Sequence, residues 1–173
     1  MKIGIFSDSH DNIQNLNKAY EVFKKNQVKH AFFCGDLVSP FVLKFIKDWS
    51  FPIKAVFGNN EGDRWGVARR LKQYSITNIE YPKRGTFWAV ELNGTKIAVY
   101  HGDSQEIVHS LVKSREYNLI FSGHTHEPHI KKEGNTTWIN PGSVAGVSEN
   151  PKVKAGTVAI YDMKTKEGKI VEL

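Results

Sequence analysis

The sequence predicts an α/β (α+β) chain built as a four-layer β-sandwich, with two mixed sheets packed face to face and helices on the outer side of each. In the first half, short apolar runs alternate with amphipathic stretches, the pattern of strands joined by crossover helices. From residue 78 the strands follow one another through tight turns. Several strands are apolar on both sides; Phe87 and Trp88, for example, are neighbours that must face opposite ways, so both sheet faces are expected to be covered.

Three pairs of a strand and a helix are expected in the first half. The strands are predicted at residues 3–6, 31–34 and 53–57, and the first and third helices at about 12–26 and 63–72. The second helix should begin at Ser39-Pro40, because a Ser hydroxyl caps a helix N-terminus and Pro suits the first helical position. The expected apolar faces are Ile13, Leu16, Tyr20 and Phe23 in the first helix, Val42, Phe45, Ile46 and Trp49 in the second, and Trp65, Ala68 and Leu71 in the third.

The second half is expected to consist of strands and tight turns with one helix. The predicted strands are 86–92, 96–100, 119–122, 130–133, 136–139, 157–161 and 169–173. Asn93-Gly94 suits a type I′ hairpin, because both central residues of that turn need positive φ. The helix carries Ile107, Val108, Leu111 and Val112 and should begin at a capping box formed by Asp103 and Glu106.

Length and composition predict one domain over residues 1–173. The chain has 173 residues, and compact domains most often run to about 100–150. Hydrophobic residues make up 40% and charged residues 24%, which supplies a core and excludes a disordered chain. Lys and Arg number 24 against 18 acids, and the formal charge of +6 favours an anionic substrate. The lysines are scattered, so a solvated surface is the better interpretation of most of them.

A single cysteine and the lack of long apolar runs predict the location. Cys34 alone cannot form an intramolecular disulfide or a multi-thiolate zinc site, which is consistent with a reducing compartment. The apolar run at residues 3–6 is far shorter than a signal-peptide core, and no stretch approaches about 20 apolar residues. We therefore expect a soluble, cytoplasmic protein with no membrane partner.

Five apolar strands each end in a residue that can bind a metal ion. The runs are IGIFSDSH, AFFCGD, KAVFGN, IAVYHG and LIFSGHTH, and their donors are Asp8, His10, Asp36, Asn59, His101, His124 and His126. Ligands bind at the carboxyl ends of strands in open α/β sheets, where loops converge on a rigid base. Glycines at 35, 58, 102 and 123 stand beside the donors and suit sharp turns and close backbone approach. Five such endings together predict a metal site.

Taken one at a time, most of these residues have a duller explanation. Asp8-x-His10 is explained equally well as a helix N-cap with an incidental histidine. The Gly-Asp and Gly-Asn dipeptides that follow the second and third strands are common in turns, and a histidine after the strand at 96–100 is often only partly buried. The imidazoles of His124 and His126, on either side of one residue after a buried strand, are hard to explain as packing. The occurrence of all these motifs in one chain favours a metal site over the separate structural explanations.

The donor types predict divalent ions and hydrolytic chemistry. Two carboxylates, one amide oxygen and four imidazoles suit Mn²⁺, Fe²⁺, Co²⁺, Ni²⁺ or Zn²⁺ and differ from the thiolate cage of structural zinc. With one bridging carboxylate, the seven residues supply four ligands to each of two ions. Two such ions, two carboxylates and one shared hydroxide leave a net charge of about +1, which favours an anionic phosphate. Hydrolysis of a phosphoester by attack of that hydroxide is the expected reaction.

These motifs resemble the calcineurin-like metallophosphoesterases, especially their small prokaryotic single-domain phosphodiesterases. The resemblance covers nearly the whole chain in order, through Asp8-Ser9-His10, Gly35-Asp36, Gly58-Asn59, His101-Gly102, Gly123-His124-Thr125-His126 and Asn140-Pro141-Gly142-Ser143. It implies one ion held by Asp8, His10 and His126 and another held by Asn59, His101 and His124, with Asp36 bridging them and positioning the hydroxide. It also implies a β-sandwich flanked by helices, Mn²⁺ as the first choice of metal, and a small phosphodiester as substrate.

The sequence departs from the family pattern at Asn60. Many members carry a histidine after the metal-binding asparagine, where it protonates the leaving group or stabilises charge. Asparagine can hydrogen-bond a phosphate oxygen but cannot act as a general acid at neutral pH. We therefore expect Asn60 to contact phosphate, and we expect slow turnover of esters with poor leaving groups. Glu61 and Arg64, which follow, are either substrate contacts or surface residues at a helix start.

The other histidines and the last motif are interpreted as structural. His30 and His109 are expected at the surface, and His129 lies outside the motif and is assigned no metal. Asn140-Pro141-Gly142-Ser143 is interpreted as a turn that braces the site, because Pro fixes φ and Gly allows close approach.

Three other functions stay open from the sequence. A retromer subunit with this fold uses it as an interaction surface after losing metal ligands, whereas all seven donors are present here. A nuclease would suit diester chemistry and a sequence pI of about 9.3, but no aromatic and basic stripe offers a platform for nucleic acid. A protein phosphatase is least favoured, since little length is left for a peptide-binding groove. Exposed aromatics such as Trp65 or Trp88 are candidates for a homo-oligomer interface.

Overall fold

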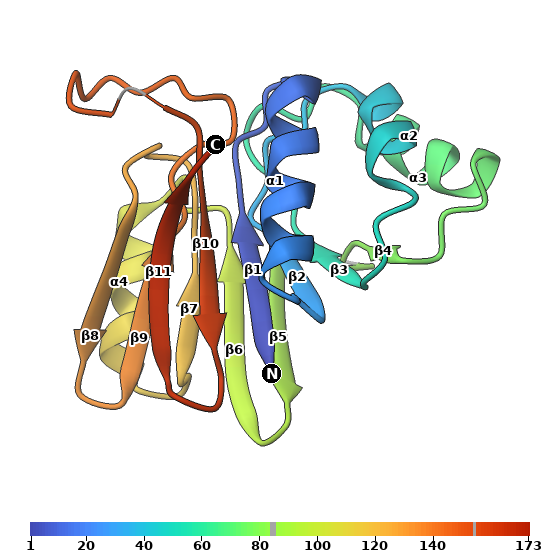
Figure 1. Cartoon of the computed structure of the whole chain (residues 1–173). Coiled ribbons are helices and arrows are strands. Elements are labelled where there is room, and N and C mark those ends of the chain that lie inside the picture. Colours follow the sequence, from blue (N-terminus) through green and yellow to red (C-terminus); the bar gives the residue numbers. More distant parts are fainter. Residues whose placement is uncertain (84–85, 154) are drawn as a thin grey trace.

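The chain forms two mixed β-sheets that pack on each other, with helices on the outer face of each (Figure 1). The computed structural model describes residues 1–83, 86–153 and 155–173. Within these residues the larger sheet has six strands in the order β11-β10-β1-β2-β3-β4, and the smaller has five in the order β5-β6-β7-β9-β8. The predicted four-layer β-sandwich is confirmed.

The two sheets divide the chain between them, and each has its own helical cover. The larger sheet contains β1 (Lys2–Phe6), β2 (His30–Phe33), β3 (Ile53–Ala55), β4 (Ile79–Glu80), β10 (Thr157–Asp162) and β11 (Glu167–Glu172). The smaller contains β5 (Phe87–Leu92), β6 (Thr95–Tyr100), β7 (Leu119–Phe121), β8 (His129–Glu133) and β9 (Thr136–Asn140). The helices are α1 (Ile13–Lys25), the 3₁₀ turn η1 (Pro40–Val42) leading into α2 (Leu43–Ile46), α3 (Arg64–Gln73) and α4 (Gln105–Ser114). In Figure 1, α1 to α3 lie on the side of the larger sheet and α4 on that of the smaller.

Three apolar cores hold the four layers together. Ile5 and Phe32 point into the central core between the sheets, where Phe121 of β7 meets them. Phe6, the next residue of β1, points the other way and packs beneath the helices of the larger sheet, because side chains alternate along a strand. Val108 joins α4 to the smaller sheet in the third core. Each large apolar side chain buried in this way contributes about 1.5–3 kcal/mol.

The helix expected at Ser39-Pro40 is shorter than predicted and begins differently. The 3₁₀ turn η1 comes first, and only four residues of α2 follow it. The Ser39 hydroxyl makes no cap bond and donates instead to the Asp11 carboxylate, which ties this loop to the one after β1. Phe45 is only half-buried whereas Leu43 is fully buried, because the tighter 3₁₀ turn rotates the apolar face.

The buried face of α3 also differs from the one predicted. Gly66 and Val67 are buried, whereas Trp65 is 88% exposed and Ala68 is exposed as well. α3 packs against η1, and a Cβ atom at position 66 would lie 2.9 Å from Cγ of Pro40. Close packing at a glycine therefore sets the rotation of this helix, which apolar periodicity cannot reveal.

The capping box predicted for α4 is wrong, although the helix lies where it was expected. The cap is Ser104, whose hydroxyl accepts the N–H of Ile107 at 3.3 Å and donates to the Glu106 carboxylate at 2.9 Å. The hydroxyl of Ser104 caps the helix by the same chemistry one residue later.

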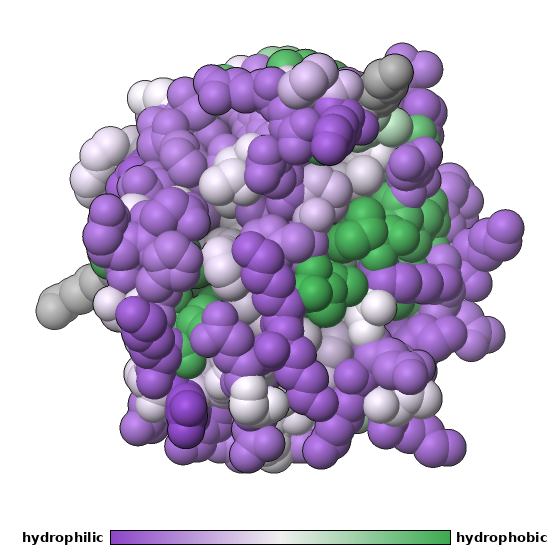
Figure 2. All heavy atoms as spheres, turned by 90° about the vertical axis from the view of Figure 1, so that its left-hand side faces the viewer, coloured by the Kyte–Doolittle hydropathy of each residue, from purple (hydrophilic) through white to green (hydrophobic). Residues whose placement is uncertain are grey.

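Of Trp65 and Trp88, the two residues considered for a homo-oligomer interface, only Trp65 is exposed. Hydrophilic side chains cover most of the face that carries α4 and β8, and apolar side chains gather in smaller patches on it (Figure 2). Trp88 is not exposed, because its ring packs on the central core and its indole N–H donates to the Ala55 carbonyl at 2.8 Å. Trp65 is thus the exposed member of the pair, and homo-oligomerisation stays a prediction.

Within residues 1–83, 86–153 and 155–173, the structure contains no helix with the length and hydrophobicity needed to cross a membrane.

The contact between β1 and α1 predicts a steric effect at Gly4. A Cβ atom there would lie 2.9 Å from the Phe23 ring, which is fully buried between α1 and the sheet. We expect Gly4→Ala to lower the free energy of unfolding by about 1–3 kcal/mol through overpacking, measured by urea denaturation. Gly62→Ala is the matched control: a Cβ atom there meets nothing within 4 Å, so its effect should stay within about 0.5 kcal/mol. Equal stability of both variants would contradict the packing described here.

Candidate metal centre

The loops after β1, β2, β3, β6 and β7 converge at one end of the sandwich. These strands run parallel within their sheets, and their carboxyl ends lie at the same edge in Figure 1. The convergence brings all seven predicted donors together in one network of contacts. Two of them are carboxylates removed from water, since Asp8 is 0% and Asp36 1% exposed. The N–H of His124, in the loop after β7, donates to Oδ2 of Asp8, in the loop after β1, at 3.0 Å.

One group of donors consists of Asp8, His10 and His126. Oδ1 of Asp8 lies 3.2 Å from Nε2 of His126 and 3.9 Å from Nε2 of His10. Asp8 Oδ1 and His10 Nε2 are buried, and neither makes a hydrogen bond of acceptable geometry to any described residue. Leaving such atoms unsatisfied is costly, and a divalent cation would satisfy both at once. This group therefore fits a metal ion.

A second group consists of Asn59, His101 and His124. Oδ1 of Asn59 lies 2.8 Å from Nε2 of His101 and 2.9 Å from Nδ1 of His124. Asp36 stands between the two groups, with Oδ2 at 3.5 Å from Nε2 of His10 and Oδ1 at 3.6 Å from Nε2 of His101. Each oxygen of Asp36 thus faces a different group, which is the arrangement expected of a bridging ligand.

Backbone carbonyls fix the tautomers of two of the imidazoles. Nδ1–H of His101 donates to the Cys34 carbonyl at 2.7 Å, and Nδ1–H of His126 donates to the Val147 carbonyl at 2.6 Å. In the neutral rings Nε2 then carries a lone pair, as metal-binding histidines require. The lone pairs of His101 Nε2 and Asn59 Oδ1 face each other and repel unless a cation accepts both. The contact with Asp8 raises the pKa of His126, against the effect of burial, because the negative carboxylate favours the protonated ring.

Most of the donors stand on strained backbone. Asp8, His10, Asp36, His124 and His126 all have positive φ, between 40° and 67°. The left-handed region costs a residue with a side chain about 1 kcal/mol or more, and such strain clusters at functional sites. This conformation could not be predicted from the sequence, because glycine is the residue that usually marks positive φ and none of the five is a glycine. Tight loops at the strand ends turn these side chains inward at the expense of backbone energy.

Asn60 is hydrogen-bonded to both oxygens of Asp36. Its backbone N–H donates to Oδ1 of Asp36 at 2.8 Å, and its side-chain amide donates to Oδ2 at 2.7 Å. An amide NH₂ carries two hydrogens, so one is left for another acceptor. The predicted contact with phosphate therefore stays a prediction that this geometry allows.

Glu61 and Arg64 hold the loop that carries Asn59, a role that sequence reasoning missed. Glu61 is buried, and its carboxylate accepts the N–H of Leu37 at 2.9 Å and that of Gly58. Burial raises the pKa of Glu61, and its two N–H donors act in the opposite direction. Arg64 donates to the Gly58 carbonyl at 3.2 Å. Glu61 thus joins the loop after β2 to the loop after β3 by a charge-assisted bond to each.

The Asn140-Pro141-Gly142-Ser143 motif braces the site as predicted. The Ser143 hydroxyl donates to the Asp8 carbonyl at 2.9 Å, and the N–H of Val144 donates to the Ser7 carbonyl at the same distance. The Asn140 amide donates to the Gly123 carbonyl at 2.8 Å. The motif therefore supports the loops after β1 and β7 from below.

The three remaining histidines make no described contact with the donors. His109 is exposed, as predicted. His30 is half-buried and stacked on Phe32, so its assignment to the surface is wrong; it is the first residue of β2 and lies over the core. Burial lowers its pKa. His129 packs against Trp138 with ring centroids 4.4 Å apart, and burial lowers its pKa to about 4.

Known proteins that match the chain share both fold and sequence with it. The sequence model of the calcineurin-like phosphoesterase superfamily domain matches residues 1–166. The phosphodiesterase MJ0936 of Methanocaldococcus jannaschii is 35% identical over 167 residues, which cover 96% of each chain. A solved structure of an archaeal phosphodiesterase superposes with a TM-score of 0.87 at 34% identity, over 100% of both chains. Vps29 of Chaetomium thermophilum superposes with a TM-score of 0.69 over 100% of this chain and 97% of its own, and its 11% identity shows the common fold alone.

Buried carboxylates and imidazoles that meet without a Lys or Arg partner, as they do in the described part of the chain, are typical of metal-dependent hydrolases. The match over residues 1–166 and the identity over nearly the full length show that the chain belongs to the calcineurin-like phosphoesterase superfamily. It is accordingly a hydrolytic phosphoesterase, as the sequence motifs predicted.

The two bonds accepted by Glu61 predict the effect of removing its charge. In Glu61→Gln one oxygen becomes an NH₂ group that faces an N–H donor, so one buried bond is lost and a repulsive contact replaces it. We expect the free energy of unfolding to fall by about 1–3 kcal/mol in urea denaturation. Glu21→Gln removes an exposed carboxylate paired with Lys24 at 3.2 Å and should change stability by less than about 0.5 kcal/mol. If Glu61→Gln is as stable as this control, Glu61 does not join the two loops.

Proposed function

We propose that the protein is a phosphodiesterase that works with two divalent metal ions. Asp8, His10 and His126 would hold one ion, and Asn59, His101 and His124 the other. The observation that carries the proposal is the position of Asp36, whose two oxygens lie 3.5 Å and 3.6 Å from imidazole nitrogens of different groups. A single buried carboxylate set between two donor groups is suited to bridging two ions.

Residues of this chain would orient the metal ligands and contact the phosphate. Bound ions would lower the pKa of a water molecule and polarise the phosphoryl oxygens of the ester. Asn60 fixes both oxygens of Asp36, so the bridging group would meet the ions without reorganising. The carbonyls of Cys34 and Val147 hold two imidazoles in the tautomer that binds metal. The second N–H of the Asn60 amide would donate to a phosphate oxygen.

Relatives favour a diester as the substrate. The 35% identical protein of M. jannaschii is named a phosphodiesterase, and so is the archaeal protein whose structure superposes at a TM-score of 0.87. Both comparisons cover at least 96% of this chain, so they include the whole site. A small phosphodiester is therefore the proposed substrate.

Two finer parts of the proposal concern the metal and the compartment. Carboxylate and imidazole donors without a thiolate suit Mn²⁺ and also admit Fe²⁺, Co²⁺, Ni²⁺ and Zn²⁺. We propose Mn²⁺ first. Cys34 is buried, and burial raises the pKa of its thiol well above the ordinary value, so it contributes no thiolate ligand. A cytoplasmic location stays a prediction.

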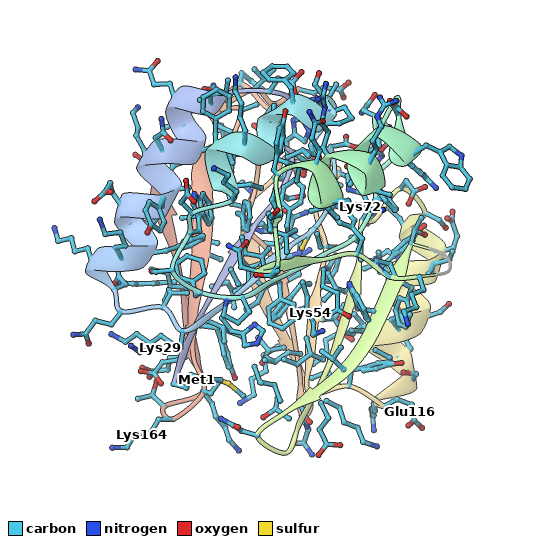
Figure 3. The ribbon with its side chains drawn as sticks, turned by 90° about the vertical axis from the view of Figure 1, so that its right-hand side faces the viewer. Met1, Lys29, Lys54, Lys72, Glu116 and Lys164 are labelled. Carbon is cyan, nitrogen blue, oxygen red and sulfur yellow. The ribbon has the colours of Figure 1, made fainter. Side chains whose placement is uncertain are left out.

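The alternative of a nuclease is less well supported by the surface. Lys29, Lys54, Lys72 and Lys164 are spread over the face in Figure 3 rather than aligned along it. Lys54 is already paired with Glu80 at 2.7 Å. A polymer of phosphates needs a continuous basic track, whereas this face offers separate charges. The alternative of an interaction module has the fold in its favour, but a fold alone does not fix a function.

Metal-dependent cleavage of a diester tests the proposal. The protein would be stripped with a chelator and given Mn²⁺ in steps, with hydrolysis of a generic aryl phosphodiester and of the matching monoester followed in parallel. We expect diester hydrolysis to rise until two ions are bound per chain, as counted by calorimetry. Asp36→Asn should lower it by at least about a hundredfold, because the link between the two donor groups loses its charge.

Asp48→Asn is the matched control, since it removes one carboxylate from a side chain that is 85% exposed and makes only a long surface contact with Lys47. Its rate should equal that of the unmodified protein. Two bound ions without cleavage of any diester would reject the phosphodiesterase and favour an interaction module. Cleavage that Asp36→Asn leaves intact would reject the assigned site.

The absence of a histidine at position 60 predicts a steep dependence on the leaving group. Aryl diesters with good leaving groups should turn over well and alkyl diesters poorly, since Asn60 cannot donate a proton. Asn60→Ala should slow all esters alike, because Asp36 loses one donor. Asn60→His should exceed Asn60→Ala only for poor leaving groups, by up to about a hundredfold. The measurement is the slope of log kcat against leaving-group pKa, and a flat plot for the unmodified protein would sink this idea.

A further inference from the structure

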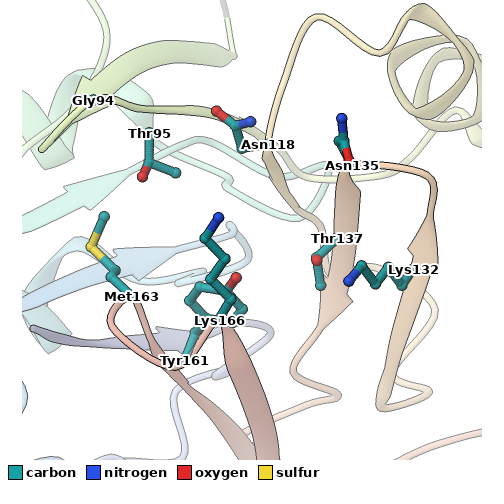
Figure 4. A pocket seen from close by; sticks show the side chains of 9 residues that line it. All are labelled: Gly94, Thr95, Asn118, Lys132, Asn135, Thr137, Tyr161, Met163 and Lys166. Carbon is teal, nitrogen blue, oxygen red and sulfur yellow. The ribbon is translucent and has the colours of Figure 1, made fainter.

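A pocket lined by nine residues is shown in Figure 4. It lies at the end of the sandwich opposite the metal centre, because Gly94 and Thr95 stand at the start of β6 and His101 follows its end. The β5–β6, β8–β9 and β10–β11 hairpins and the residue before β7 surround it, so both sheets contribute to its wall. Its volume is about 360 Å³, within the usual range of about 300–1,000 Å³ for small-molecule sites. Thr95 of the pocket begins β6, and His101 follows the end of the same strand. At about 3.3 Å per residue, some 20 Å separate the two sites.

The side chains around this pocket are nearly all hydrogen-bond donors. Lys132 and Lys166 extend into it from different hairpins (Figure 4). The Asn118 oxygen already accepts the N–H of Lys96 at 2.9 Å, which leaves its NH₂ group for a ligand. No acidic side chain lines the pocket within the residues that the structure describes. Two positive charges without a counter-charge favour an anion.

The base of the pocket is a fixed, buried surface rather than a shallow dip between mobile side chains. Tyr161 is 5% exposed and Thr137 is 9% exposed, and the two residues come from different sheets. Burial raises the pKa of Tyr161, so its phenol stays protonated at neutral pH. Lys132 is paired directly with Thr137 in the β8–β9 register, which places both side chains on the same face.

Lys166 stands in a tight turn between β10 and β11. Lys166 has φ of 59°, and its N–H donates to the Asp162 carbonyl at 2.8 Å. Glycine or asparagine suits such a position best, whereas lysine adopts it at a cost of about 1 kcal/mol. The Asp162 carboxylate accepts the N–H of Lys164 at 2.9 Å within the same turn and does not line the pocket.

We propose that this pocket binds a small organic phosphate monoester. A monoester carries a charge of about −1.5 to −2 at neutral pH, which matches the two lysines, whereas a diester carries only one negative charge. The amide and hydroxyl donors satisfy the phosphate oxygens, and the Met163 side chain and Tyr161 ring offer apolar contact to the organic part. A monoester is also the product class of diester cleavage, but binding here is independent of the metal centre.

Calorimetric titration of the full chain with 5′-AMP tests this proposal. Titrations would be made with Mn²⁺ present and again in chelator, so that the metal centre contributes in one series only. We expect binding in both series, and Lys132→Gln/Lys166→Gln should weaken it by about tenfold or more in chelator. Both lysines are exposed surface residues, so this variant is expected to fold.

The matched control is Lys131→Gln/Lys164→Gln, which removes the same charge from the same two hairpins at side chains that do not line the pocket. It should stay within about twofold of the unmodified protein, because screened surface charges act weakly at a distance. Adenosine, which lacks the phosphate, should not bind. Equal losses in both double variants, equal binding of adenosine, or no binding in chelator would each overturn the assignment. None of these results bears on metal-dependent hydrolysis, which is measured separately.

Discussion

Two carboxylates, those of Asp8 and Asp36, are buried where the two sheets meet, and the design of the metal-centre end depends on keeping them there. A buried carboxylate is costly unless opposite charge and hydrogen bonds compensate it. In the described chain they meet imidazoles and N–H groups and no lysine or arginine. The remaining compensation is the task for which divalent ions are suited. Because the carboxylates follow different strands of one sheet and their imidazole partners come from loops of both sheets, the site is complete only when the two sheets are packed on each other.

The strain in the loops has its explanation in the same constraint. Side chains on straight strands would point alternately to the two faces of a sheet, and none would point along the strand toward a shared centre. A left-handed residue in the loop that follows a strand turns the chain sharply and aims its side chain across the end of the sheet. Five donors adopt this conformation. Gly58 and Gly123 allow the neighbouring loops to come close, since a Cβ at either position would collide with the carboxylate of Asp36 or Asp8. The donors converge at the cost of backbone strain in these loops. Hydrogen bonds made by Glu61 and Ser143 stabilise the strained loops.

The architecture and the donors could be predicted from the sequence because their signals are local and repeated. Each strand that supplies a donor is an apolar run with its donor just beyond the end, and the two-sided apolar strands required a second layer. What could not be predicted depends on contacts between distant segments. The role of Glu61 needs the Leu37 N–H, 24 positions earlier. The rotation of α3, which exposes Trp65, depends on Gly66 against Pro40. Ser39 resembles a helix cap locally, yet its hydroxyl is taken by Asp11 from another loop. Spacing within one element carries none of this information.

The two ends of the sandwich differ in what their geometry allows. At the carboxyl ends of the parallel strands, consecutive loops meet over a rigid base, and acidic residues there gather cations. At the amino ends, hairpin turns from both sheets leave a gap, and lysines on flexible stems leave positive charge around it. The central core between the sheets separates the two ends and is close-packed with residues such as Phe32 and Phe121, whose ring centroids are 5.1 Å apart. Such a core would couple the two ends only through an element that has two discrete packing arrangements. The physical expectation is therefore that each end binds its own ligand without altering the affinity of the other.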